Sequence, residues 1–509
     1  MLAITPEEMR RIEGCCADRL DELMQTAGTN AAKEFLDHAM RTLPPRHRRR
    51  FVIIAGKGNN GGDALCVAKY LHVHGQDVCV HSVCALADYS GSASSQACNF
   101  PDEIPYHIVN QRFEEVVLQS GDVIIDGLLG IGLKGNARGA CAEIISQINE
   151  SGLPVYSIDC PSGLDCDSGN GEPVVRADFT VTMAFPKVGF FVDKGPKCIG
   201  RLQVVPIGLP HDVEQSASGG LDVFTLQDAA ALLSRRPADS HKNTLGHCLC
   251  VAGSSLYSGA PILAAEAAMR SGAGLVTLAV PNMAYPRQAS ASIMVASVGN
   301  DAHFISEDST EIQLLAQRST AMLYGPGTGA KVPSEFLEAI LELDQPTVID
   351  ADGIRLLAKS PNCLAQLGER ENAVILTPHP GEMSALIHGL GLGALSEASR
   401  TEQASKVAAH CNAYIILKGQ HSIAAAPDGR ISINASGSPA LATAGTGDVL
   451  AGIMAASLAQ RKSAWDAIRL AAFVHGLAAE LFPFATLSMT ADDLLPLIPQ
   501  AFRHISPIA

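Results

Sequence analysis

Aromatic residues and positive charge are both scarce in this chain of 509 residues. Aromatic residues make up 5% of the sequence, with a single tryptophan, and 37 lysines and arginines face 52 aspartates and glutamates. Because a phosphate backbone needs a basic surface, the formal net charge of −15 argues against a nucleic acid partner. An anionic substrate would then be held by local groups, such as glycine loops and helix N-termini.

Long apolar segments and paired cysteine motifs are absent as well. No stretch reaches the ~18 uninterrupted apolar residues of a transmembrane helix, so no membrane partner is expected. The start, MLAITPEEMRR, carries acidic residues early and no apolar signal segment. The 14 cysteines form no C-x-x-C pair with the spacing of zinc ligands. These absences favour a cytoplasmic protein whose thiols are reduced and mostly buried.

What the chain does contain is a regular alternation of short apolar segments and helical stretches. The first series is FVIIAG, VCVHSV, VIIDGLLG, VYSID, FTVTMAF and LQVVPIG; the second is CLCVAGS, LVTLAV, AMLYGPG, TVIDAD, AVILTPHPGE, AYIILKG and ISINAS. Continuous apolar runs are typical of strands buried on both faces, which indicates largely parallel sheets in an α/β fold. Since 509 residues exceed a single core, we place a domain boundary in the polar segment 211–220.

The first series opens with a glycine loop, AGKGNNGGDA, at residues 55–64. Gly56, Gly58 and Gly61 have the G-x-G-x-x-G spacing of a dinucleotide-binding turn. A dehydrogenase of that type also needs an acidic residue after the second strand to hold the ribose hydroxyl groups, and here that strand ends at His81 without one. The polar side chains of the loop exceed what a pyrophosphate turn needs, so a dehydrogenase is disfavoured.

Oxygen-bearing side chains follow several strands of this first series. Asn60 lies in the glycine loop, Asp126 begins DGLLGIGLKGN, and Ser162 lies in DCPSGLD. Because parallel strands end at one edge of a sheet, we expect these loops to be adjacent. Hard oxygen ligands suit a group I or II cation, or a sugar-phosphate cradle, better than a transition metal. The alternative is that the aspartates merely cap helices and turns.

The motifs GNNGGD, DGLLGIG and SIDCPSGLD together resemble the NAD(P)H-hydrate epimerase family, over about residues 1–210. The resemblance implies a Rossmann-like three-layer sandwich, which we set at residues 1–213, with K⁺ bound by Asn60, Asp126 and Ser162. The implied substrate contacts are Asn59, Asn60, Gly61, Gly62, Asp63, Gly130, Ile131, Gly132, Leu133, Lys134, Gly135, Asn136 and Asp159.

Asp159 is our hypothesis for the acid/base of the epimerase-like domain. Lys187 is a second candidate, with a phosphate contact or a surface lysine as the alternatives. The sequence departs from the family at Ala64, where glycine is usual, and at Gly127 and Ile131, where alanine and threonine are common.

The second series contains the segment ATAGTGDVLAGIMAASLAQ, in which Gly445 and Gly447 precede Asp448 and an apolar helix follows at once. Free backbone amides at a helix start bind anions, and glycine lets them approach a phosphate closely. An aspartate beside such amides can take a proton from a hydroxyl group during phosphoryl transfer. This G-x-G-D element is typical of ribokinase-like folds; the alternative is an ordinary N-cap aspartate after a glycine turn.

With SHKN, GPGTG, DADG, TPHPGE and LKGQHS, this segment resembles the ADP- or ATP-dependent NAD(P)H-hydrate dehydratase family over residues 221–509. The resemblance implies a ribokinase-like α/β domain with Asp448 as catalytic base and Mg²⁺ on the phosphates. Glu382 is a candidate Mg²⁺ ligand, and His379 is expected to hydrogen-bond to substrate or backbone rather than to bind a metal. The implied substrate contacts are Ala273, Gly329, His379, Pro380, Gly381, Glu382, Met383, Ser384, Ala385 and Asp448. The implied ADP or ATP contacts are Lys418, Gly419, Gln420, His421, Ser422, Ser438, Thr443, Ala444, Gly445, Thr446 and Gly447.

Together the two resemblances predict a fused repair enzyme. Its first domain would interconvert the R and S hydrates, NADHX and NADPHX, and its second would dehydrate the S form, so that neither epimer accumulates. The alternative is a ribokinase-like kinase for a vitamin or sugar alcohol with an N-terminal nucleotide-binding module, since G-x-G-D alone does not separate the two. TPHPGE, LKGQHS and the epimerase-like motifs favour repair. The resemblance also implies a homo-oligomer, and the choice between ADP and ATP stays open.

Overall fold

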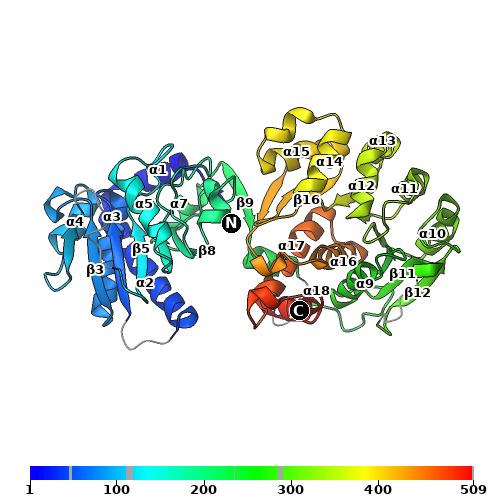
Figure 1. Cartoon of the computed structure of the whole chain (residues 1–509), viewed down its shortest axis with the longest axis horizontal. Coiled ribbons are helices and arrows are strands. Elements are labelled where there is room, and N and C mark those ends of the chain that lie inside the picture. Colours follow the sequence, from blue (N-terminus) through cyan, green and yellow to red (C-terminus); the bar gives the residue numbers. More distant parts are fainter. Residues whose placement is uncertain (45–48, 110–117, 234, 285–289, 507–509) are drawn as a thin grey trace. The chain divides into compact units, whose positions relative to one another are not determined.

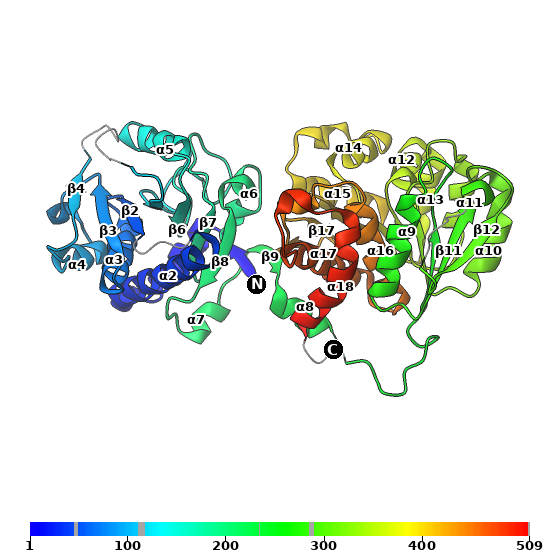
Figure 2. The same cartoon turned by 60° about the horizontal axis from the view of Figure 1, so that its bottom comes forward.

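The computed structural model describes residues 1–44, 49–109, 118–233, 235–284 and 290–506. It divides the chain into two compact units, Leu2–Leu221 and Met1 with Asp222–Ala509 (Figures 1 and 2). The polar segment 211–220 lies at the end of the first unit. In the described part of the chain, no helix has the length and apolar character needed to cross a membrane.

The sheet of the first unit has the strand order β4-β3-β2-β5-β6-β7-β8, and each neighbouring pair is parallel. The order reverses between β2 and β5, as in Rossmann-like folds, whose ligands bind at the carboxyl edge near such a reversal. Every strand that the apolar segments predict is confirmed, and the short strands β1 and β4 are additional. The strands of this unit are β1 Leu2–Ile4, β2 Arg50–Ala55, β3 Asp77–Ser82, β4 Tyr106–Ile108, β5 Val123–Gly127, β6 Val155–Ile158, β7 Phe179–Met183 and β8 Arg201–Val205.

Helices cover both faces of this sheet, which gives the expected three layers. On β2, Ile53 packs in one apolar cluster with Phe35 of α2 and Leu65 of α3, whereas Ile54 packs in another with Ile144 of α5. Successive residues of a strand point to opposite faces, so the two clusters lie on opposite sides of the sheet. The helices are α1 Pro6–Gly14, α2 Leu20–Thr42, α3 Asn59–Val73, α4 Ser92–Cys98, α5 Ala140–Glu150, α6 Gly195–Cys198 and α7 His211–Gln215.

The sheet of the second unit has the order β9-β18-β17-β16-β15-β14-β13-β10-β11-β12. Its pairs are parallel except those of β17, which is antiparallel to β16 and β18. The predicted strands are confirmed, and β9, β12 and β17 are additional. The strands are β9 Gly220–Phe224, β10 His247–Val251, β11 Leu275–Pro281, β12 Met294–Val298, β13 Ala321–Tyr324, β14 Thr347–Ile349, β15 Val374–Leu376, β16 Tyr414–Leu417, β17 Ile423–Ala425 and β18 Ile431–Asn434.

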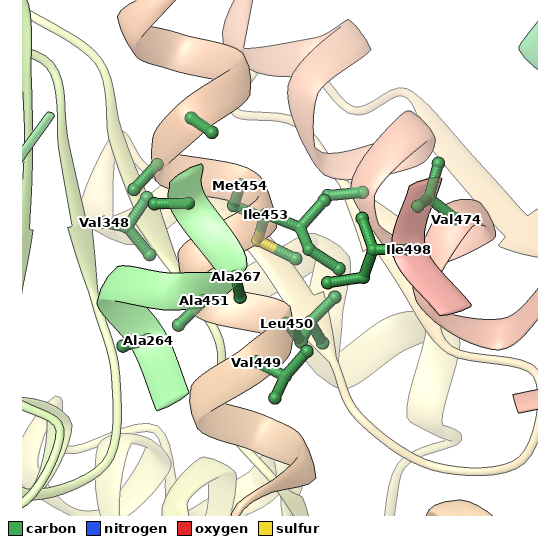
Figure 3. Packing of buried hydrophobic residues seen from close by; sticks show 14 of the residues in the cluster. Ala264, Ala267, Val348, Val449, Leu450, Ala451, Ile453, Met454, Val474 and Ile498 are labelled. Atoms are coloured by element: carbon green, nitrogen blue, oxygen red, sulfur yellow. The ribbon is translucent and has the colours of Figure 1, made fainter. Parts of the chain in front are cut away.

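Helix α16 (Thr446–Ala459) lies at the centre of the second hydrophobic core (Figure 3). Its residues Ala451, Ile453 and Met454 are buried among side chains of α9, α17 and α18. A Cβ added at Gly452 would lie 2.2 Å from the carbonyl oxygen of Ala264, so α16 and α9 pack closer than larger residues allow. The start of α16 is therefore anchored by a dense core. The other helices are α8 Leu226–Leu232, α9 Gly259–Arg270, α10 Ser309–Ala316, α11 Ser334–Leu341, α12 Asp352–Lys359, α13 Pro361–Glu369, α14 Pro380–Gly389, α15 Arg400–Cys411, α17 Ala464–Glu480 and α18 Ala491–Ile505.

The cysteines depart in one place from the expected reduced state. Cys160 and Cys166 form a disulfide in the loop after β6, where both sulfur atoms face the carbonyl of Leu164. The expectation is wrong for this pair, because the loop folds back on itself and brings the two thiols together. The other cysteines are free, and most of them are buried as expected.

The family departures at Ala64 and Gly127 meet in the structure. Ala64 lies on α3 and Gly127 ends β5, and a Cβ at Gly127 would lie only 2.7 Å from that of Ala64. Alanine at both positions would therefore clash in a closely packed core. Glycine at position 127 keeps the contact free of overlap.

The substitution Gly127→Ala should destabilise the first unit by about 1–3 kcal/mol, the usual cost of overpacking a core. Adding Ala64→Gly should recover much of that loss, because it removes the opposing methyl group. Urea unfolding of both single variants and the double variant measures this coupling. Gly14→Ala is the matched control, since nothing lies within 4 Å of its added Cβ. Equal stabilities of the Gly127→Ala and Gly14→Ala proteins would contradict the packing argument.

Candidate active sites

The glycine loop of the first unit joins β2 to α3 through backbone contacts that leave no room for side chains. The Gly56 amide donates to the Gly127 carbonyl at 3.0 Å, and a Cβ at Gly56 would lie 1.8 Å from the carbonyl oxygen of Leu128. Helix α3 then begins at Asn59 after Gly58, and no side chain caps its N-terminus. The first amides of α3 are therefore available to an anionic group.

Asn60, Asp126 and Ser162 come together at this edge, as predicted. Asn60 Nδ2 donates to the Leu129 carbonyl at 2.9 Å, and Ser162 Oγ lies 3.2 Å from the same oxygen and 2.5 Å from Asp126 Oδ1. Asp126 is completely buried, and burial raises the pKa of its carboxyl group against the hydrogen bonds from Ser162. Asn60 Oδ1 is buried and has no hydrogen-bond partner within the described ranges. A bound cation would satisfy this orphaned oxygen.

Asp159 follows β6 in the left-handed backbone region, with φ of 59°. Its Oδ1 accepts hydrogen bonds from Lys187 Nζ at 2.5 Å, from Thr182 Oγ1 at 3.0 Å and from the Met183 amide at 3.1 Å. Lys187 is completely buried and also donates to the Phe185 carbonyl at 3.0 Å. The interpretation of Lys187 as a surface lysine is therefore wrong, and its ammonium group is a buried partner of Asp159.

Residues 130–136 form a largely exposed loop beside Asn60. A Cβ added at the first glycine of this loop would lie 3.2 Å from Asn60 Cβ. Arg10 of α1 donates to the Ile131 carbonyl at 3.2 Å, so α1 also borders the site. No motif indicates this contribution, because the acceptor is a backbone carbonyl and Arg10 is an ordinary polar position of an amphipathic helix.

Several carboxyl groups gather around Lys187. Burial, together with the charges of Asp159 and Glu13, raises the pKa of Asp63 well above its usual value. Burial and the charge of Asp159 also raise the pKa of Glu13, against the opposing charges of Lys187 and Arg10. The side-chain carboxyl groups of Asp63 and Glu13 have no hydrogen-bond partner among the described residues. The site therefore combines an ion-paired carboxylate with carboxyl groups that retain protons more readily.

In the second unit, Asp448 lies in the first turn of α16, just after the left-handed Gly445. Its carboxyl group has no hydrogen-bond partner in the described part of the chain. Burial and the charge of Asp350 raise the pKa of Asp448 to about 7, against the opposing charge of Lys418. A carboxylate with this pKa can accept a proton near neutral pH and is well suited to act as a general base.

Lys418 lies between Asp350 and the N-terminus of α16. Its Nζ is 2.8 Å from Asp350 Oδ1, which also accepts a hydrogen bond from Thr377 Oγ1 at 2.5 Å. A Cβ added at Gly447 would lie 3.4 Å from the same Nζ. Burial alone would lower the pKa of Lys418, but Asp350 reverses the effect and the pKa is raised. An ammonium group beside a helix N-terminus forms a site for a phosphate.

His379 and Glu382 cap the N-terminus of α14. The His379 Nδ1 atom accepts from the Gly381 amide at 3.0 Å, and Glu382 Oε2 accepts from the His379 amide at 3.0 Å. The expectation that His379 bonds to the backbone is therefore confirmed. The second oxygen of Glu382 lies 3.3 Å from His379 Nε2 and 3.7 Å from Arg355 Nε. Burial raises the pKa of Glu382, against the charge of Lys418.

The predicted nucleotide contacts fall on segments 418–422 and 438–447, and the second segment leads directly into α16. Arg400, on the first turn of α15, donates to the carbonyls of Lys418 and Gln420 at 3.3 and 3.1 Å. These hydrogen bonds hold the backbone of segment 418–422 in place. The sequence gives no signal for Arg400, because its partners are again backbone carbonyls.

The other predicted substrate contacts differ in their access to this site. The Gly329 amide donates to Asp352 Oδ2 at 2.9 Å, and the charge of Asp352 acts on Asp448, so Gly329 belongs to the same edge. The Met383 side chain is completely buried, and Ala273 is buried in the core around α16. These two side chains therefore expose little or no surface, and their contact with a substrate stays a prediction.

Two family models match the chain. The one described as YjeF-related protein N-terminus matches residues 20–189, and the one described as NAD(P)H-hydrate dehydratase matches residues 248–500. A solved structure, the ADP/ATP-dependent NAD(P)H-hydrate dehydratase from Bacillus subtilis co-crystallized with ATP/Mg²⁺, is 29% identical. The match covers 57% of this chain and 100% of that chain, with a TM-score of 0.48.

Relatives also match across both units. Bifunctional NAD(P)H-hydrate repair enzymes from Moorella thermoacetica and Salinibacter ruber are 34% and 35% identical over 498 and 503 residues. The matches cover 95% and 94% of this chain, and 92% and 91% of the relatives. With this identity over nearly the full length of each relative, the chain belongs to the family of bifunctional NAD(P)H-hydrate repair enzymes.

Proposed function

We propose that residues 1–213 epimerise the R and S hydrates of NADH and NADPH, and that residues 221–509 dehydrate the S hydrate at the expense of ADP or ATP. The observation that carries the proposal is the partner-free carboxyl group of Asp448 at the start of α16, with the Lys418 ammonium beside it. A base, a cation and free helix amides in one place suit proton removal coupled to phosphoryl transfer.

In the dehydratase, Asp448 takes the proton of the hydrate's ring hydroxyl group while that oxygen attacks the terminal phosphorus of ADP or ATP. The amides of residues 445–447 and Lys418 stabilise the charge on the transferred phosphoryl group. The new phosphate ester leaves with the electron pair of its C–O bond. Loss of a neighbouring ring proton then restores the dihydropyridine of NADH or NADPH.

Magnesium fits this edge mainly through the phosphates of the nucleotide. Asp448 has a free carboxyl group, whereas Glu382 fits the role of metal ligand less well, because its oxygens already face the amide and ring of His379 and the Arg355 guanidinium. When bound, Mg²⁺ would neutralise part of the negative charge on the phosphates.

In the epimerase, a K⁺ ion fits among Asn60 Oδ1, Asp126, Ser162 and the Leu129 carbonyl. When bound, it supplies a positive charge that holds the surrounding loops together. The α3 amides bind the dinucleotide phosphates. Asp159 acts on the hydrated ring, because the donors to its Oδ1 leave Oδ2 free.

The proposal also includes a cytoplasmic homo-oligomer that takes no nucleic acid or membrane partner. Its support is the resemblance to the repair family and the acidic net charge of −15. Light scattering after size-exclusion chromatography tests the oligomer, and cell fractionation tests the location.

Replacing the base tests the dehydratase. Asp448→Asn should lower the rate of NADH recovery from S-NADHX by about 100- to 10,000-fold, which is the usual contribution of a general base to the rate. In the unmodified protein, the rate should fall as the pH drops below about 7, because protonated Asp448 cannot accept the hydroxyl proton. Return of NADH absorbance in the presence of Mg²⁺ and ADP or ATP measures both effects.

Asp239→Asn, which changes an exposed aspartate, is the matched control for this test and should leave the rate unchanged. Full activity of Asp448→Asn would refute the assignment. Phosphorylation of vitamin or sugar alcohols without any NADH recovery would instead identify a kinase.

Potassium replacement tests the proposed cation site. Exchange of K⁺ for tetramethylammonium should slow consumption of R-NADHX and leave consumption of S-NADHX unchanged, because only the first unit has the orphaned Asn60 oxygen. Asn60→Leu should be slow in both salts, whereas Asn99→Leu, on an exposed position, should keep the response to K⁺. An equal R-NADHX rate in both salts would argue against a cation in this site.

A further inference from the structure

The loops that carry Asp63 and Asp159 lie side by side. A Cβ added at Gly127 would lie 2.7 Å from Ala64 Cβ and 3.3 Å from Ile158 Cδ1. Ala64 follows Asp63 and Ile158 precedes Asp159, so the neighbours of both aspartates pack against the same glycine. The same two segments also share a hydrogen-bond acceptor. Asn60 Nδ2, three residues before Asp63, and Ser162 Oγ, three residues after Asp159, both donate to the Leu129 carbonyl oxygen. The two aspartates therefore lie near each other at the carboxyl edge of the sheet, close enough for the charge of Asp159 to act on Asp63.

The two carboxyl groups have different surroundings. All the donors to Asp159, from Lys187, Thr182 and Met183, reach Oδ1, and Oδ2 has no hydrogen-bond partner among the described residues. Lys187 is surrounded by four oxygens at 2.5–3.4 Å, so its ammonium group is fixed and cannot itself reach a substrate. Lys187 is thus a positioning residue for Asp159.

Asp63 has no such partner. It lies near the start of α3 and is partly exposed, and its carboxyl group forms no hydrogen bond with a described residue. Burial and the negative charges of Asp159 and Glu13 raise its pKa, and Lys187 opposes them; Cys66, one turn along α3, is the remaining titratable neighbour. This edge of the sheet thus pairs a carboxyl group that binds its proton more readily than an ordinary aspartate with a carboxylate held by a lysine, a combination that suits paired acid and base roles.

We propose that Asp63 is the general acid of the epimerase and that Asp159 is the base that works with it. This inference rests on the proposed epimerase function and adds a catalytic role for Asp63. The C–O bond of the hydrate breaks, its electron pair stays on oxygen, and the Asp63 proton converts the leaving group to water. The lone pair of the ring nitrogen forms a C=N bond. Water then adds to the other face of the ring and gives its proton to Asp159. Exchange with solvent removes that proton from Asp159 and returns one to Asp63 before the next turnover, and the reverse reaction uses the two groups in exchanged roles.

The test follows turnover of R-NADHX by the full chain with Mg²⁺ and ADP or ATP, since R must be epimerised before it is dehydrated. Asp63→Asn should lower the turnover rate for R-NADHX by about 100-fold or more, with KM little changed, and leave turnover of S-NADHX intact. Asp63→Glu should keep part of the activity, because it retains an acid. Asp102→Asn, on an exposed loop, is the matched control.

The pH profile gives a second readout. In the unmodified protein, R-NADHX turnover should decline at high pH as Asp63 loses its proton, and Asp63→Asn should abolish that decline. Glu13→Gln should shift the decline to lower pH, because removing its negative charge lowers the pKa of Asp63. Thermal unfolding of each variant checks that the first unit is folded.

Near-normal turnover by Asp63→Asn, or a raised KM with turnover preserved, would overturn the assignment and leave Asp63 as a substrate contact only. If the unmodified protein consumes R-NADHX no faster than spontaneous epimerisation allows, the proposed epimerase function itself fails. Equal loss of activity in Asp63→Asn and Asp63→Glu, with both proteins folded, would also count against the assignment, since Asp63→Glu retains an acid.

Discussion

Both sheets gather polar side chains at their carboxyl edges because glycines there allow one backbone to touch another. At Gly56 an added Cβ would lie 1.8 Å from the Leu128 carbonyl oxygen, and at Gly325, after β13, it would lie 2.0 Å from that of Asp350. Gly325 also has φ of 118°, a conformation that residues with side chains rarely adopt. Each contact holds one strand-end loop against the next, so residues distant in sequence form a single site.

The two units distribute charge at these edges in the same way, although their sheets differ. In each, a lysine pairs with an aspartate at a strand end, and a second aspartate nearby has no hydrogen-bond partner among the described residues and a raised pKa. The pairs are Lys187 with Asp159 and Lys418 with Asp350, and the partner-free aspartates are Asp63 and Asp448. Placing one carboxyl group against a cation and another against a carboxylate is a direct way to separate their proton affinities.

Much of this arrangement could be predicted, because strand ends and glycine spacing are local features of a sequence. Asn60, Asp126 and Ser162 converge since parallel strands end at one edge, which the apolar segments already indicate. The burial of Lys187 could not be predicted, because its acceptors come from the loop after β6, from the end of β7 and from the turn that follows it. The role of Arg400 could not be predicted either, since it donates hydrogen bonds to backbone carbonyl groups, which every residue has. The additional strand β12 escapes a search for continuous apolar runs, because it is partly exposed.

The contact between Ala64 and Gly127 also restricts which residues the chain can accept at two positions that are distant in sequence. Alanine at both positions would bring two Cβ atoms to 2.7 Å from each other. The residue that fits at position 127 therefore depends on the residue at position 64, and the two positions must be substituted together for their effects to be understood.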